Sequence, residues 1–522
     1  MVRLKILQNY PHDDILNLID KAVKLTYKHF TDGELGANPF TFHEPDLIYY
    51  RAKVLADMGD TNKAIKVLLN LLKSLNIFSM TDRHKDKILG MLYFTLCELL
   101  YITDRHDEQL KYAVDGSRLS VEVSSGRYVP DFEFLIAKSK CKTVSNPKES
   151  VKHFMHAYAG FFLLGQMKKV TEVVETAKND FGLTLNLYGM EKLDSLIKNI
   201  DKELSRGIAV ECKNPVELIE RLCYERGFKV SRIYEGIIKR QSYSDVMSGK
   251  SGFRYFNLEA IGQRLGIDIS IYDNYLLDTN DFKMVNLRDK IHTKSVKLDY
   301  NGMEGLLSEL YELNKKKKYT VIGQFIAYVR VSMEYETQKI SADVMRCKLT
   351  EVLKITHKSF NEANFQMLHL TRTEIAIINK IASSYKQDSG FNEVRIYEQL
   401  LSIHKRVYID EVEGDRTLGM IYLNYSMAVG IRGNDKFAQE LTSIGLVHDV
   451  SCKNLLLSHA FVYNIAYSKM LNGANKNDIL PYFLLSYYGA SSQSSYHNWS
   501  KGCMNNVKSK LLEFCGLDIE RK

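Results

Sequence analysis

Apolar residues recur at three- and four-residue spacing along most of the chain. The spacing is clearest over Asp46–Leu75, Lys85–Ile102, Phe132–Lys142 and Arg416–Ile431. It places the apolar side chains on one face of an α-helix, whereas a half-buried strand would show strict alternation. We therefore predict an all-α fold.

One segment, LIYYRAKVLADMGDTNKAIKVLLNLLK, fits a tetratricopeptide-like pair of helices. Ala52 and Ala64 are small residues that let two helices cross closely, and Gly59 with Asp60 supplies the turn. Any helical hairpin needs small residues at its crossing, so repetition along the chain would strengthen this prediction.

The chain also resembles itself. A shift of 329 positions aligns 86–160 with 415–489 without a gap, and seventeen of the seventy-five paired residues are identical. Unrelated sequences would give roughly four or five identities at ordinary residue frequencies. We predict two helical-repeat arrays related by duplication, and two unrelated arrays of similar composition are the alternative.

The shift also predicts the domain organisation. One array spans 1–205 and the other 325–522, with a helix-turn-helix domain between them at 213–280. A linker and connecting helix fill 281–324, and the basic run Lys315–Lys318 is expected to be a solvated part of that linker. At the same shift the counterpart of this domain would lie before Met1, so we expect the first array to have no such domain ahead of it within this sequence.

The sequence pattern of the central domain predicts that this domain contacts double-stranded DNA. Residues 215–276 fit five short helices, and the third, at about 241–248, is in the position of a recognition helix that ends at Gly249. Val246 and Ile233 are expected to face inward. Glutamine can pair with adenine, while serine and tyrosine more often reach phosphates. The candidate DNA-binding residues are Lys239, Arg240, Gln241, Ser242, Tyr243, Asp245, Lys250 and Arg254.

The charge of the central domain, rather than the net charge of the whole chain, supports the prediction of DNA binding. The whole chain carries a formal net charge of +8, which is mild for 522 residues. Between Arg226 and Arg254, however, seven basic residues face only two acidic ones. Such a basic patch fits phosphate binding, which must weaken steeply as salt rises. The alternative is a degenerate module kept for packing or dimerisation.

The pattern EGI-x(3)-QSYSDVMSGK, followed by NLEAIGQRLGIDIS, resembles the Cro/C1-type (XRE-family) helix-turn-helix of Firmicutes regulators. The array behind it is similar to the tetratricopeptide-type domain of the Rgg, PlcR, PrgX and Rap group of peptide-pheromone receptors. The resemblance covers about 213–522. It implies a transcription regulator that binds DNA as a homodimer and senses a short signalling peptide.

In such receptors, asparagine side chains from successive helices hold the peptide backbone. An amide suits this role because it both donates and accepts hydrogen bonds. The resemblance therefore implies Asn379, Asn424 and Asn464 as peptide-binding residues. The shift of 329 positions pairs Asn424 with Thr95 and Asn464 with Leu135, so the first array lacks these two amides. We therefore expect the first array to serve dimerisation or inhibition instead. Alternatively, these asparagines only link helices or lie exposed.

Other chemistry is not indicated. We find neither a signal peptide nor a membrane span, and eight scattered cysteines without a CxxC pair fit reduced thiols in the cytoplasm. His153 and His156 are spaced more closely than the i,i+4 pair of a zinc helix and lack the glutamate of HExxH, so we expect both on a helix surface. The GKSG at Gly249 lacks the earlier glycine of a phosphate-binding loop. We expect no enzyme activity, cofactor or metal.

The sequence thus predicts a cytoplasmic DNA-binding transcription regulator controlled by a short peptide. The competing hypothesis is a tetratricopeptide-like adaptor that binds a protein partner and whose helix-turn-helix no longer reads DNA.

Overall fold

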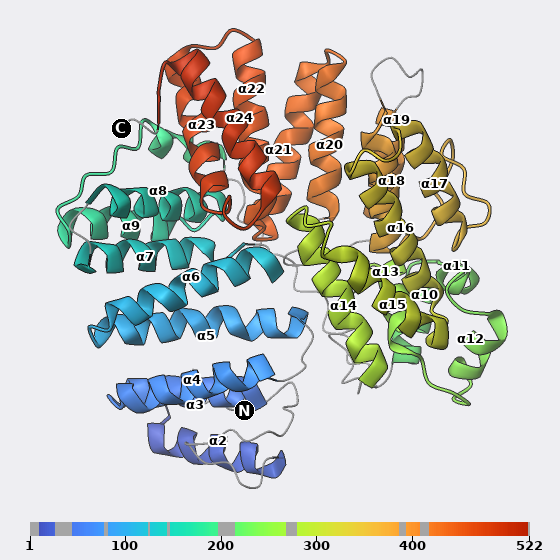
Figure 1. Ribbon diagram of the computed structural model, residues 1–522, viewed down its shortest axis with the longest axis horizontal. Coiled ribbons are helices and arrows are strands. Elements are labelled where there is room, and N and C mark those ends of the chain that lie inside the picture. The colour runs from blue at the N-terminus through green and yellow to red at the C-terminus, as the bar shows by residue number, and fades with distance from the viewer. Residues whose placement is uncertain are drawn as a thin grey trace. The chain divides into compact units, whose positions relative to one another are not determined.

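The computed structural model describes residues 10–26, 44–77, 82–123, 126–143, 147–196, 215–267, 279–385, 393–407 and 417–519. Within these ranges every regular element is helical, and no strand occurs (Figure 1). The predicted all-α fold is confirmed. No helix in these ranges combines the length and hydropathy that a membrane span requires.

Residue contacts divide the chain into two compact units. The first unit contains Met1–Tyr188 and Leu485–Asn506, and the second contains Gly189–Leu484 and Val507–Lys522. The helix-turn-helix domain therefore shares a unit with the array that follows it. A short piece of the C-terminal region, 485–506, belongs to the first unit, which the sequence did not indicate.

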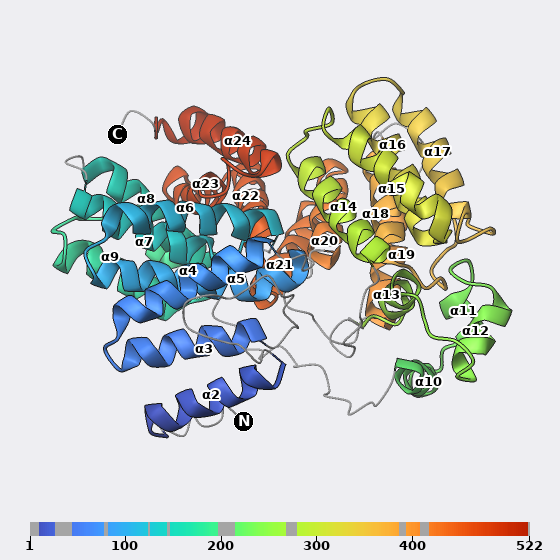
Figure 2. The same cartoon turned by 60° about the horizontal axis from the view of Figure 1, so that its bottom comes forward.

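The first unit is a series of antiparallel helices, each packed on the next in chain order. Figure 1 and Figure 2 show the early helices lying side by side. They are α2 (His12–Thr26), α3 (Glu44–Asp57), α4 (Thr61–Ile77), α5 (Asp82–Ile102), α6 (His106–Val123), α7 (Val129–Thr143), α8 (Pro147–Leu163) and α9 (Met167–Asn179).

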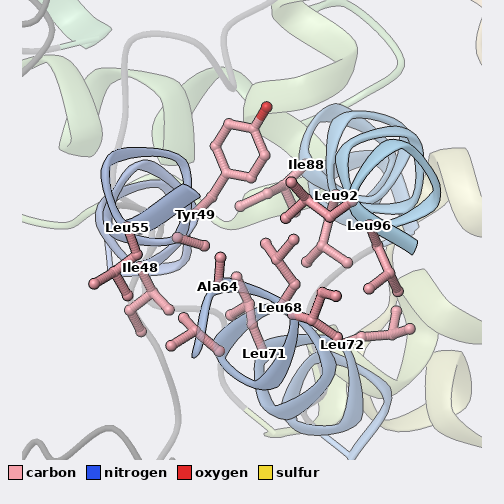
Figure 3. Close-up of a cluster of buried hydrophobic side chains, with 14 of the residues drawn as sticks. Ile48, Tyr49, Leu55, Ala64, Leu68, Leu71, Leu72, Ile88, Leu92 and Leu96 are labelled. Carbon is pink, nitrogen blue, oxygen red and sulfur yellow. The ribbon is translucent and has the colours of Figure 1, made fainter. Parts of the chain in front are cut away.

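The predicted tetratricopeptide-like pair is α3 and α4. Ala52 and Ala64 are both fully buried, and Gly59 has a φ of +89°, which an L-residue adopts only with strain. Apolar side chains from α3, α4 and α5 point toward one another and form the local core (Figure 3). The small residues and the turn glycine have the roles that the sequence predicted.

The second unit begins with the short helices of the central domain and continues into the second array. Its helices are η1 (Met190–Leu196), α10 (Pro215–Glu225), α11 (Val230–Tyr234), α12 (Arg240–Met247), α13 (Tyr255–Arg264), α14 (Thr279–Val296), α15 (Met303–Lys317), α16 (Thr320–Glu336), α17 (Ala342–Lys354), α18 (Arg372–Ser383), α19 (Glu393–Val407), α20 (Thr417–Ile431), α21 (Asp435–Ser451) and α22 (Leu455–Leu471). Two further helices, α23 (Lys476–Ser491) and α24 (Asn498–Cys515), contribute residues to both units.

The segment 281–324, predicted to hold a linker and a connecting helix, consists mostly of helices α14 and α15 and the start of α16. Helices α14 and α15 pack on each other and form a common core with α16. Lys315, Lys316 and Lys317 are the last turn of α15, where positive charge interacts favourably with the helix dipole. The prediction that Lys315–Lys318 form a linker is therefore wrong, because these lysines complete a helix that Lys318 ends in the left-handed conformation. Lys315, Lys316 and Lys318 are nevertheless exposed to solvent, as predicted.

The two arrays repeat the same local structure. A shift of 329 carries α6 onto 435–452, where α21 spans Asp435–Ser451. It also pairs Gly116 with Gly445, and these glycines lie against the equivalent rings of Phe132 and Phe461. Each array thus forms an equivalent helix crossing with a glycine and a phenylalanine at paired positions, which supports the predicted duplication.

Adding a methyl group at either crossing should destabilise its array. A Cβ on Gly116 would lie 2.4 Å from Phe132 Cζ, and one on Gly445 would lie 2.3 Å from Phe461 Cε1. We expect Gly116→Ala and Gly445→Ala each to lower the free energy of unfolding by about 1–3 kcal/mol, the usual cost of overpacking. Urea denaturation measures the change.

The control for these variants is Gly305→Ala in α15, because a Cβ there meets nothing within 4 Å. That variant should be neutral or stabilising by up to about 1 kcal/mol, since alanine favours a helix over glycine. Equal stability of all three variants would show that the two glycines are not needed for close helix crossing.

Candidate nucleic-acid interface and ligand face

The central domain has its own small core. Leu218, Ile219, Ile233, Val246 and Ile261 are buried together, so helices α10 to α13 form one packed group. Ile233 and Val246 face inward, as predicted. Because the core is closed by these side chains, the polar side of α12 is left at the surface.

Helix α12 presents polar and basic residues from its first turn. Arg240, Gln241 and Ser242 are exposed, and Lys239 precedes them as the exposed N-cap residue. Gln241 Nε2 donates a hydrogen bond to Asp245 Oδ1 at 2.9 Å, which orients the amide along the helix surface. Gly249, at a φ of +74°, follows the helix directly, as predicted.

Tyr243 does not lie at this surface. Its side chain is only 6% exposed and stacks on Tyr234 at a centroid distance of 4.4 Å. Burial raises the pKa of Tyr243, consistent with an apolar setting. Its prediction as a DNA contact is corrected: Tyr243 and Val246 are three residues apart, so both point into the core.

Ser244 is a further polar residue on the exposed side of α12 that was not among the predicted contacts. It lies one turn after Arg240 and is exposed on the same side of α12. The inward pair Tyr243 and Val246 would have indicated it, because a residue between two core positions of a helix faces outward. Asp245 is partly buried and serves as the acceptor for Gln241.

The remaining predicted cations follow α12. Lys250 is exposed, and neither it nor Lys239 or Arg240 forms an ion pair among the described residues. Arg254 is also exposed, but it donates a hydrogen bond to the backbone oxygen of Lys317 at 3.0 Å. The positive charges of Lys239, Arg240 and Lys250 thus have no ion-pair partner in the part of the chain that the structure describes.

A buried ion pair joins the central domain to the second array. Arg264 on α13 lies 3.0 Å from Glu374 on α18, and both side chains are completely buried. Arg264 also donates to the backbone oxygen of Glu235 at 2.6 Å. Glu374 in turn forms the capping box of α18 with Thr371. One network therefore fixes α13 to the first turn of α18.

Two glycines bring the backbones of the domain and the array into direct contact. Gly236 and Gly266 have φ values of +74° and +68°. A Cβ would lie 2.0 Å from the Thr356 oxygen at the first position and 2.5 Å from the Val407 oxygen at the second. Only glycine fits these contacts, so the domain is docked closely at two points as well as through Arg264.

His369 lies within the same junction. Its Nδ1 donates to the backbone oxygen of Arg264 at 3.2 Å, and its ring packs edge-on to Phe228 at a centroid distance of 4.5 Å. Burial, together with the charges of Arg406 and Arg264, lowers the pKa of His369 to about 4. The folded protein therefore keeps this ring neutral under mildly acidic conditions.

The second unit should lose stability on acidification through His369. Because the folded pKa of about 4 is below the ordinary value, the unfolded chain binds more protons between about pH 6.5 and 4, and stability falls as pH falls through that window. We expect a loss of about 1–2 kcal/mol from this group. Urea midpoints measured across the window for wild type and His369→Gln test this: the wild-type curve should be steeper, and parallel curves would contradict it.

The three predicted peptide-binding asparagines lie on three alternate helices of the second array. Asn379 lies on α18, Asn424 on α20 and Asn464 on α22. Helix α20 packs against both α18 and α22. Asn424 Nδ2 donates to Asn379 Oδ1 at 2.9 Å. The side chain of Asn464 makes no hydrogen bond among the described residues.

Exposed apolar side chains lie on the same helices as Asn424 and Asn464. Met420, Asn424 and Met427 follow one another at helical spacing on α20, and Met427 is 51% exposed. On α22, Leu471 is 59% exposed. We call this set of residues the amide face; it consists of Asn379, Met420, Asn424, Met427, Asn464, Tyr467 and Leu471. Asn379 is buried at 8% exposure, so its prediction as a direct peptide contact is corrected: it accepts the hydrogen bond of the half-buried Asn424 instead. Exposed apolar side chains that gather on a surface mark interaction sites.

No protein-family profile matches the chain. No curated protein matches it either. Among solved structures, PlcR from Bacillus thuringiensis, in complex with the peptide PapR7 and DNA, matches 56% of this chain and all of its own at 14% identity and a TM-score of 0.38. Naa15/Naa10 bound to HypK-THB matches all of this chain and 78% of its own at 10% identity and a TM-score of 0.22. At these TM-scores neither match establishes a shared fold.

Proposed function

We propose that this protein is a DNA-binding transcription regulator in which α12 enters the major groove and the amide face binds a short peptide. The observation that carries the proposal is the exposed series Lys239, Arg240 and Gln241 at the start of α12. Recognition helices meet base edges with their N-terminal residues, and arginine and glutamine are the side chains that pair bidentately with guanine and adenine.

The phosphates would be held by the cations around α12. Lys239 precedes the helix and Lys250 follows its C-terminal glycine, so the two charges flank the base-reading residues along the chain. Serine hydroxyls at Ser242 and Ser244 add neutral donors on the exposed part of the helix. A single domain of this size reads one half-site, so we propose that the protein acts as a homodimer.

Selection from a pool of random-sequence DNA duplexes with the purified full-length protein tests this proposal. We expect enrichment of two related half-sites whose centres are about 10 base pairs, or a multiple of that, apart. If repeated rounds enrich no sequence over the starting pool, the proposed base readout is wrong.

The amide face is the proposed peptide site because it combines unfilled amide groups with exposed apolar side chains. Asn464 has no hydrogen-bond partner among the described residues, so its amide can donate to and accept from a peptide. Asn424 keeps its amide oxygen as an acceptor, while the buried Asn379 holds it through the hydrogen bond from Asn424 Nδ2. Met420, Met427 and Leu471 offer apolar contacts for alternate side chains of an extended peptide.

Removing the amides should weaken peptide binding. For a peptide selected from a random library of short linear sequences, we expect Asn424→Ala and Asn464→Ala each to reduce affinity about tenfold, the effect of about 1–1.5 kcal/mol per lost hydrogen bond. Isothermal titration measures the affinities. Asn477→Ala, which removes an exposed asparagine on α23, is the control. Equal peptide affinity of all three variants would show that Asn424 and Asn464 do not contact the peptide.

The junction offers a route from the peptide to the DNA. Glu374 binds Arg264 at the start of α18, and Asn379 lies in the same helix little more than one turn later. If α18 can take two positions, a peptide that binds one of them more tightly would favour that position and, through Arg264, shift the central domain.

An adaptor that binds a protein partner is the second candidate function, because the exposed Met427 and Leu471 could equally contact a partner helix. Arg240→Ala combined with Gln241→Ala separates the two functions. Lost DNA affinity with unchanged activity in the cell would favour the adaptor.

A further inference from the structure

A histidine and glutamate cluster lies in the first unit, outside the sites described so far. Glu133 on α7 faces His153 and His156 on α8. Glu133 Oε2 lies 2.7 Å from His153 Nδ1 and 2.9 Å from His156 Nδ1. The expectation that both histidines lie on a helix surface is wrong for His156, which is only 4% exposed, because α7 covers that face of α8.

We propose that Glu133, His153 and His156 bind a divalent transition-metal ion of the Zn²⁺ class. Two imidazole nitrogens and one carboxylate oxygen are a donor set that holds Zn²⁺ and related ions in proteins. The i,i+3 spacing puts both histidines on one face of α8, and the missing third ligand comes from a different helix rather than from an HExxH motif.

The donor atoms already converge on one point. The three ligand atoms lie within 4.8 Å of one another. Bonds of about 2.0–2.1 Å in a tetrahedral site separate neighbouring ligand atoms by about 3.3 Å. The present oxygen-to-nitrogen separations are therefore a few tenths of an ångström too short, and small movements of the side chains would admit the ion.

A carboxylate and a neutral imidazole are the forms that bind a metal ion, so binding of the ion should release any proton held by the histidines.

A further side chain orients one of the ligands. His156 Nε2 lies 3.1 Å from Ser491 Oγ, near the end of α23 and within the first unit. A hydrogen bond at the far nitrogen fixes the ring of a ligating histidine and directs its other nitrogen to the metal. The ion would thus join α7, α8 and the 485–506 segment, and a water molecule would complete its coordination on the side of the partly exposed His153.

Titration of Zn²⁺ into untagged, full-length protein freed of metal by a chelator tests the proposal. We expect one high-affinity ion per chain and a rise in the melting temperature on binding. Co²⁺ should give the visible absorption of a four-coordinate site. Glu133→Gln and His153→Gln should each lose more than about 100-fold in affinity, and Ser491→Ala about 10–100-fold.

The control is His12→Gln, which removes an exposed histidine from the same unit and should bind Zn²⁺ as wild type does. Circular dichroism establishes that each variant is folded, and His153 lies at the edge of the cluster, so its replacement should leave the helices intact. No bound ion in wild type, or wild-type affinity in both Glu133→Gln and His153→Gln, would overturn the site and leave only a hydrogen-bond network. Neither result bears on the proposed DNA binding.

Discussion

Arg264→Ala is expected to lower the free energy of unfolding of the second unit by about 3–5 kcal/mol, the cost of breaking a buried ion pair by removing one partner. The guanidinium group is completely buried against Glu374, and its loss leaves that carboxylate enclosed without its main counter-charge. It also leaves the backbone oxygen of Glu235 without its donor. The central domain should therefore separate from α18 more readily.

Guanidinium chloride denaturation of the full-length protein measures this loss. Arg221→Ala is the matched control, because its i,i+4 pair with Glu225 is exposed and such pairs contribute about 0.3–0.5 kcal/mol. Replacing both charges, as Arg264→Met with Glu374→Gln, should recover part of the loss, since no unpaired charge stays buried. A cost below about 1 kcal/mol for Arg264→Ala would contradict a stabilising role for the pair.

Replacing Arg240 and Gln241 together with alanine is expected to weaken binding to the selected duplex by more than about 100-fold. Each bidentate pair with a base contributes about 1–3 kcal/mol of discrimination, so losing two gives a change of this size or larger. Fluorescence anisotropy with a labelled duplex measures the affinities. The change should be much smaller for a random duplex, because these residues are proposed to read bases.

Two controls make this experiment specific. Lys436→Ala removes an exposed charge on α21, away from the central domain along the chain, and should keep wild-type affinity. Tyr243→Phe should also keep it, because the ring is in the core and the hydroxyl does not reach the surface of α12. A strong loss of DNA affinity in Tyr243→Phe, together with wild-type affinity in the Arg240→Ala and Gln241→Ala double variant, would show that Tyr243 and not the other two residues contacts the DNA.

The parts of the fold that the sequence predicted depend on short-range patterns. Helical spacing predicted the all-α class, and the two alanines with Gly59 located a close helix crossing that the structure confirms. The 329-residue shift also pairs two glycines that lie against equivalent phenylalanines at helix crossings, which supports the predicted duplication. Local spacing and pairwise identity carry this information without knowledge of the tertiary structure.

The remaining features depend on contacts between distant segments. Arg264 and Glu374 are 110 residues apart, so their pairing leaves no local pattern. His156 is buried through contacts with Glu133 on α7 and with Ser491 on α23, which are distant along the chain. Tyr243 was misplaced for a different reason: it lies near the start of the predicted recognition helix, where DNA contacts are expected, whereas the small domain uses its aromatic ring to fill the core.

The most direct test of the central claim, that the surface of α12 binds DNA, is the salt dependence of affinity for the selected duplex. With two or three phosphate contacts per domain and two domains per site, the slope of log K against log salt should be about −4 to −5. In Lys239→Ala combined with Lys250→Ala the slope should become shallower by several units, because each lost phosphate contact removes about one. A slope near zero in wild type, or the same slope in both proteins, would contradict the claim.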